Sequence, residues 1–150
     1  METGGAASVR YALISENAAS GASGSGGGLL VADGAMASLA FSEVTGNTAN
    51  RAGAGVELFD DALTTGADDV ATVTLRQVTV ADNAIDTAAP GNGGGLHAGG
   101  GAAVMVSQST FSGNTANEGG GLWINVSASL TLDNSTVSGN ASDEDGGGVY

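Results

Sequence analysis

The chain has 150 residues, enough for one domain, and it contains 27 glycines, a single proline and no cysteine. Its formal net charge is −13 with three arginines and no lysine, which argues against a nucleic acid or an anionic membrane as partner. Without cysteine there is no disulfide framework and no thiolate zinc site, and no run approaches the roughly 18 apolar residues of a membrane span, so we expect no membrane insertion by this segment.

The apolar residues recur in register, in five stretches that share one spacing. In each stretch an apolar residue stands three positions before an asparagine, and glycines and an aliphatic residue follow. A repeat of this kind decides the fold before any single element is assigned. The asparagines are Asn17, Asn47, Asn83, Asn114 and Asn140, and the repeats span about 7–29, 37–56, 73–96, 104–122 and 130–150.

Each repeat predicts three strands. Ahead of Asn83, Val73 and Leu75 alternate as in a strand, and Val80 follows after a slip that marks a bend. The third strand begins at the aliphatic residue after each glycine run, as at Leu122. Only the second repeat breaks the spacing, with an acidic insertion at 60–69.

No single repeat can bury its own apolar residues, so we expect the repeats to stack with their strands paired in parallel. The predicted fold is all-β, a right-handed parallel β-helix (β-solenoid) of about five coils that forms one domain over 1–150. The asparagines, at one fixed corner, are expected to form a ladder of amide hydrogen bonds. Glycine at the next corner supplies a positive φ or a close backbone approach.

The Phe-x-x-Asn element at Phe111 to Asn114, its Val and Ile variants, and the Gly-Gly-x-aliphatic elements resemble repeats of chlamydial-type polymorphic outer membrane proteins. They are also similar to the wider group of parallel β-helix repeat proteins of bacterial surfaces. The resemblance covers about 9–150 and implies a pectate-lyase-like β-helix, typically part of a secreted adhesin or an autotransporter passenger. It implies an extracellular or cell-surface location.

The repeat begins near Ala7 and reaches Tyr150 without an evident cap, although open solenoid ends normally need one. Two explanations stay open. The chain is an excerpt of a longer β-helix with adjoining coils, or its two ends meet other copies and build fibres through homotypic end-to-end contacts.

The register predicts one outward column of side chains on the third strands: Leu30, Glu57, His97, Trp123 and Tyr150. If coils stack at about 4.8 Å, His97, Trp123 and Tyr150 form a solvent-facing aromatic strip suited to stacking on sugar rings or to contact with a host or cell-surface protein. The alternative is a set of rings covered by a neighbouring loop or domain.

Acidic residues cluster in predicted loops, where carboxylates can coordinate a hard cation such as Ca²⁺. They are Asp60, Asp61, Asp68 and Asp69 in the insertion, and Asp143, Glu144 and Asp145 near the last glycines. No known calcium-binding spacing accompanies them, so a solvated acidic surface is the favoured interpretation and no cofactor is expected.

The function expected from these features is that of a noncatalytic extracellular structural or adhesive module. The lone histidine, His97, has no nucleophile motif nearby, so no catalytic residues are assigned. The alternative is a carbohydrate-active enzyme, a polysaccharide lyase or glycoside hydrolase, because the β-helix fold also hosts such enzymes.

Overall fold

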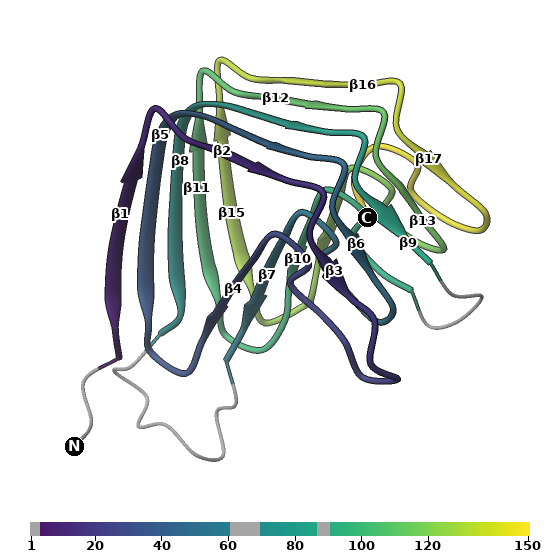
Figure 1. The fold of residues 1–150 in the computed structure, drawn as a ribbon, viewed down its shortest axis with the longest axis horizontal. Coiled ribbons are helices and arrows are strands. Elements are labelled where there is room, and N and C mark those ends of the chain that lie inside the picture. Colours follow the sequence, from purple (N-terminus) through teal and green to yellow (C-terminus); the bar gives the residue numbers. More distant parts are fainter. Residues whose placement is uncertain (1–3, 61–69, 87–90) are drawn as a thin grey trace.

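In the computed structural model, which describes residues 4–60, 70–86 and 91–150, the chain winds into an all-β parallel solenoid (Figure 1). Each strand pairs in parallel with its counterpart in the coils before and after it. The solenoid expected from the repeat is therefore confirmed. It makes about four turns rather than five, because the fifth repeat joins the last sheet only by an isolated bridge between Leu122 and Val149.

Three sheets form the walls. Sheet 1 contains eight strands, which are β1 (Ala6–Arg10), β2 (Leu13–Ser15), β5 (Met36–Thr45), β8 (Thr72–Ala81), β11 (Ala103–Ser107), β12 (Thr110–Ser112), β15 (Ser129–Asp133) and β16 (Thr136–Ser138). Sheet 2 contains five short strands, which are β3 (Ala18–Ala19), β6 (Thr48–Ala49), β9 (Ala84–Ile85), β13 (Thr115–Ala116) and β17 (Ala141–Ser142). Sheet 3 contains four strands, which are β4 (Leu29–Ala32), β7 (Val56–Phe59), β10 (Leu96–Ala98) and β14 (Leu122–Ile124).

The core runs along the axis between the sheets and is built from the periodic apolar residues. Val73, Leu75 and Val80 are fully buried, as are Leu96 and Leu122 across from them. Burial of one such side chain contributes about 1.5–3 kcal/mol. In the last coil the equivalent side chains are only partly covered, since no further coil packs on that side of the described chain.

The five asparagines form a continuous ladder. At each step the side-chain Nδ2 of one asparagine donates to Oδ1 of the asparagine in the next coil, at 2.9 Å in all four steps. The backbone N–H of the same residue donates to that oxygen as well. In the four later coils the second hydrogen of Nδ2 is donated to a backbone carbonyl oxygen of the preceding coil. Asn47, Asn83 and Asn114 are fully buried, and every hydrogen-bonding position of these amides is filled.

Glycines pack directly on this ladder. A Cβ at Gly28, Gly55, Gly95 or Gly121 would lie 2.4–2.6 Å from a glycine carbonyl oxygen of the next coil. A different glycine, at the start of each run, takes a left-handed φ between 54° and 69°, as at Gly93. The two reasons expected for glycine, close approach and positive φ, thus apply to separate positions of one run.

The bend within sheet 1 is made without glycine. The bend residues Tyr11, Phe41, Gln77, Gln108 and Asn134 have φ between 46° and 54°, a conformation that costs roughly 1–2 kcal/mol for residues with a Cβ. In three of the five coils the next residue is a serine, whose hydroxyl hydrogen bonds offset part of this cost. Ser109 Oγ, for example, accepts from the Val78 N–H of the preceding coil at 3.0 Å and donates to the Ser107 carbonyl. Ser42 and Ser135 repeat this arrangement.

Candidate functional site

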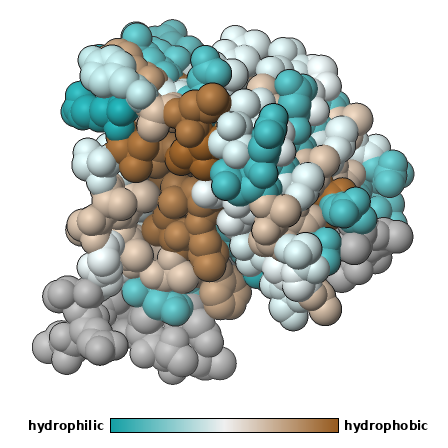
Figure 2. Space-filling view, in the orientation of Figure 1, coloured by the Kyte–Doolittle hydropathy of each residue, from teal (hydrophilic) through white to brown (hydrophobic). Residues whose placement is uncertain are grey.

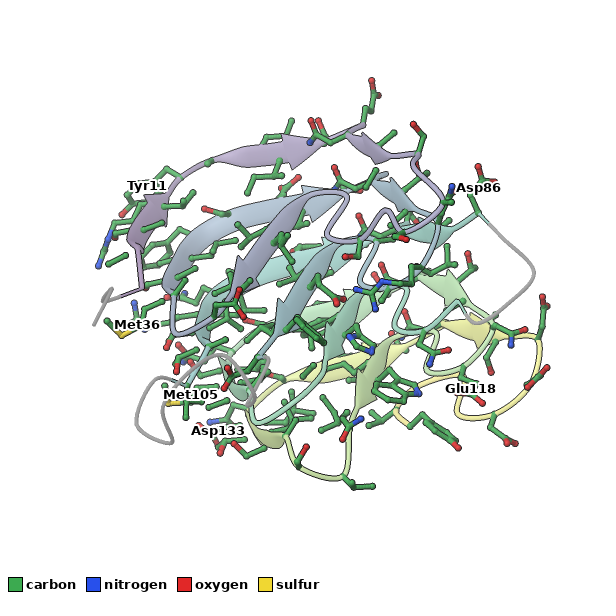
Figure 3. The ribbon with its side chains drawn as sticks, turned by 90° about the horizontal axis from the view of Figure 1, so that it is seen from below. Tyr11, Met36, Asp86, Met105, Glu118 and Asp133 are labelled. Carbon is green, nitrogen blue, oxygen red and sulfur yellow. The ribbon has the colours of Figure 1, made fainter. Side chains whose placement is uncertain are left out.

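The outward column of sheet 3 brings three rings and an ion pair together. The strand register places Leu30, Glu57, His97 and Trp123 directly one above another. Tyr150 continues the column, since its neighbour Val149 bridges to Leu122. Seen from below, the rings and charged groups of this face project from successive coils (Figure 3).

The three rings are stacked. The centroids of His97 and Trp123 are 4.5 Å apart with planes 10° from parallel. Those of Trp123 and Tyr150 are 6.2 Å apart with an angle of 21°. Both distances lie in the range of offset-stacked aromatic pairs. The spacing follows from the distance between coils, so the backbone sets the geometry of the strip.

The expectation that His97 faces solvent is wrong. Its exposed fraction is 6%, and that of Glu57 is 0%. His97 packs between two other members of the column, because its Nδ1 lies 3.0 Å from Glu57 Oε2 and its ring stacks on Trp123. Arg51, from the segment before β7, contacts Glu57, and a Cβ added at Gly99 would lie 3.1 Å from His97 Cε1 and 3.4 Å from Phe59 Cδ2, so Gly99 packs close to both rings. Of the three rings, Trp123, which is half-buried, and Tyr150, which is 48% exposed, remain accessible.

The buried part of the column, Glu57 and His97, contains an ion pair. Arg51 Nη2 donates to Glu57 Oε1 at 3.1 Å and to Ser25 Oγ at 3.0 Å. His97 Nδ1 lies 3.0 Å from Glu57 Oε2, but its N–H is not aligned for a hydrogen bond. A fully buried carboxylate needs such compensation, because an unpaired buried charge is strongly destabilising. Arg51 is therefore the neutralising partner of Glu57.

In the accessible part of the column, Trp123 and Tyr150, one hydrogen bond fixes the indole ring. The indole Nε1–H of Trp123 donates to Glu118 Oε2 at 3.2 Å. This bond holds the indole plane parallel to the imidazole beneath it. Because Glu118 is bonded to the indole and Glu57 to Arg51, both carboxylates of this face are already paired. The arrangement is suited to stacking on a flat ligand, and we assign no acid–base chemistry to it.

The described acidic residues of the two predicted clusters differ in exposure. Asp61, Asp68 and Asp69 lie outside the described residues, whereas Asp60 is buried at 6% exposure. Asp143, Glu144 and Asp145 are exposed. Within the described ranges no three His, Asp or Glu side chains gather closely enough to hold a metal ion. Calcium binding by these acids stays a prediction.

Sequence reasoning missed Arg51, Asn92 and Glu118 as parts of this face. Asn92 and Glu118 directly precede a left-handed glycine, and isolated bridges align them with Ala52. The left-handed glycine is thus a usable marker. The residue directly before it in each repeat, as at Asn92 and Glu118, flanks the ring column.

Another aromatic group was also missed. Tyr11 and Phe41, at the bend of sheet 1, stack with centroids 5.1 Å apart, and the Arg76 guanidinium lies 5.3 Å from the Phe41 centroid. Tyr11 is 77% exposed. The group lies on a different sheet from the ring column and provides a matched site for control substitutions.

Comparisons of the chain with protein-family models, with curated proteins and with solved structures give no match. Within the described ranges, no helix has the length and apolar character needed to cross a membrane. The candidate site is therefore interpreted from its own geometry.

Proposed function

We propose that this chain is a noncatalytic structural and adhesive module of an extracellular or cell-surface protein. The observation that carries the proposal is the stacked pair of accessible rings, Trp123 and Tyr150, on a wall held rigid by the asparagine ladder. A rigid platform of parallel rings loses little conformational entropy when it binds a flat partner. The resemblance to repeats of polymorphic outer membrane proteins and bacterial surface adhesins supports the same role.

The ligand class that fits the platform is a neutral glycan. Sugar rings stack on indole and phenol faces through their apolar C–H surfaces. A net charge of −13 disfavours an anionic polysaccharide, and Arg51, the arginine beside this column, is bonded to Glu57.

Affinity electrophoresis against soluble neutral polysaccharides (glucan, galactan, mannan and xylan) tests this proposal. For a polysaccharide that retards the wild-type chain, Trp123→Ala should weaken binding about tenfold, the value of one lost stacking contact. Tyr11→Ala removes a more exposed ring on sheet 1 and should leave retardation unchanged. Trp123→Phe should retain most of it.

Equal loss in Trp123→Ala and Tyr11→Ala, or no retardation by any polysaccharide, would remove the adhesive part of the proposal. The same incubations, assayed for new reducing ends and for unsaturated products, test the alternative of a polysaccharide lyase or glycoside hydrolase. Time-dependent release of either product would show that the module is an enzyme.

A further inference from the structure

The hydrogen-bond ladder has a direction, and its two ends are complementary. At every step the asparagine of the earlier coil donates, from its backbone N–H and from Nδ2, to Oδ1 of the later one. In the described chain Asn17 Oδ1 therefore accepts no hydrogen bond, while the Asn140 backbone N–H and one Nδ2 hydrogen have no acceptor. The C-terminal coil thus offers the two donors that the N-terminal coil lacks.

The strand register places opposite charges at the same two ends. One outward column of sheet 1 consists of Arg10, Ala40, Arg76, Ser107 and Asp133, in that order along the axis. A second copy stacked in register beyond the last coil would bring its Arg10 directly opposite Asp133. Both residues are exposed, and opposite charges that face each other across paired strands attract.

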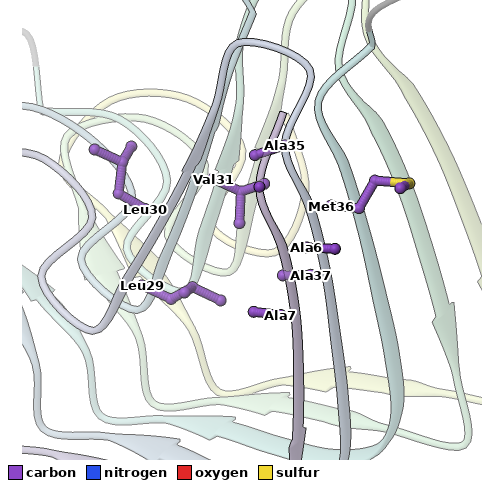
Figure 4. A pocket seen from close by; sticks show the side chains of 9 residues that line it. Ala6, Ala7, Leu29, Leu30, Val31, Ala35, Met36 and Ala37 are labelled. Atoms are coloured by element: carbon purple, nitrogen blue, oxygen red, sulfur yellow. The ribbon is translucent and has the colours of Figure 1, made fainter. Parts of the chain in front are cut away.

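The apolar surfaces of the two ends also match. Hydrophobic side chains gather on the face of the first coil (Figure 2), around an open pocket of about 240 Å³ between β1 and β4 (Figure 4). Its lining includes the small residues Ala6 and Ala7 together with Leu29, Val31 and Ala35.

The C-terminal coil presents larger side chains at the equivalent positions. Leu130 belongs to the column of Ala7, and Val149 and Tyr150 to the columns of Leu29 and Leu30. Val149 and Tyr150 are 47% and 48% exposed, and Leu30 is 52% exposed. In-register stacking would cover all of them and place a leucine side chain against the alanines that line the pocket.

We propose that the C-terminal coil of one copy docks on the N-terminal coil of a second copy, in register, with Asn140 bonded to Asn17 and Asp133 paired with Arg10. Such a contact joins two different surfaces and does not close on itself, so it propagates into an unbranched fibre. The inference rests on the structural part of the proposed function and is independent of the glycan contact.

Reversal of the two charges tests the junction without touching the core. Arg10→Glu leaves acidic residues at both ends, and Asp133→Arg leaves arginines at both ends. Each variant alone should raise the critical concentration for fibre growth about tenfold, as expected when an attractive cross-strand pair becomes repulsive. An equimolar mixture of the two variants should restore growth, because every junction between unlike chains then pairs glutamate with arginine or aspartate with arginine.

Sedimentation velocity and negative-stain electron microscopy of the 150-residue chain measure this growth, and circular dichroism checks the fold of each variant. A wild-type chain that stays monomeric at all concentrations overturns the proposal. Fibres that ignore the charge reversals, or variants that fail to recover on mixing, also overturn it. A monomer that still binds glycan through Trp123 would reject only this inference, whereas fibres without glycan binding would reject only the adhesive part of the function.

Discussion

Removal of one asparagine from the middle of the ladder should have a large and calculable effect. Asn83 accepts from the Asn47 backbone N–H and from Asn47 Nδ2, and it donates to the Val44 carbonyl and to Asn114 Oδ1. Asn83→Ala leaves two buried groups without a partner, the Asn47 backbone N–H and one Asn47 amide hydrogen, while the parallel pairing of β5 with β8 still gives the Val44 carbonyl a ladder bond. Asn114 Oδ1 keeps the bond from the backbone N–H of residue 83.

An unsatisfied buried donor costs about 1–3 kcal/mol, so the two together should lower the free energy of unfolding by at least about 2 kcal/mol. Asn17→Ala is the matched control. Asn17 is exposed and its side chain makes a single hydrogen bond within the described chain, so the expected loss is about 1 kcal/mol or less.

Urea denaturation followed by circular dichroism measures both variants through linear extrapolation. The slope with denaturant should not change, because the exposed surface of the unfolded chain is nearly the same. Equal losses for Asn83→Ala and Asn17→Ala would refute the claim that the ladder stabilises the stack.

Two further substitutions test other parts of the structure. Gly95→Ala places a Cβ 2.5 Å from the Gly121 carbonyl oxygen and should cost about 1–3 kcal/mol in thermal unfolding. Gly21→Ala, which meets no atom within 4 Å, should be neutral, and a similar loss in both would show that the close approach is unimportant. Arg51→Ala leaves the buried Glu57 carboxylate without its cation and should destabilise by about 2–3 kcal/mol. Glu57→Gln removes the buried charge itself and should cost less, so the reverse order in urea titration would contradict the assigned pairing.

The repeat made most of the fold predictable. Apolar residues at fixed offsets from Asn83, Asn114 and Asn140 defined the inward positions of sheet 1, because a strand exposes alternate side chains to opposite faces. The turn count was less accurate. Counting motifs gave five, but a coil closes only when its third strand pairs, and the last repeat supplies a single bridge at Val149.

The sequence predicted which residues of the candidate site align in one column, but it did not predict how deeply each is buried. Spacing placed His97, Trp123 and Tyr150 in one column, whereas the burial of His97 follows from side-chain contacts, with Glu57 and Trp123 on either side of the imidazole. Periodicity within a strand contains no information about such coverage. The slip in spacing predicted the bend of sheet 1 but not the positive φ of Tyr11 and Phe41, since these residue types give no local signal for that conformation.

Hydrogen exchange of the asparagine side-chain amides, resolved by NMR, tests the central claim of a ladder-stabilised solenoid most directly. The Nδ2 protons of the buried Asn47, Asn83 and Asn114 should exchange only through opening of the stack and remain protected for hours, while those of the exposed Asn17 should exchange at once. Rapid exchange at all five asparagines would contradict the account.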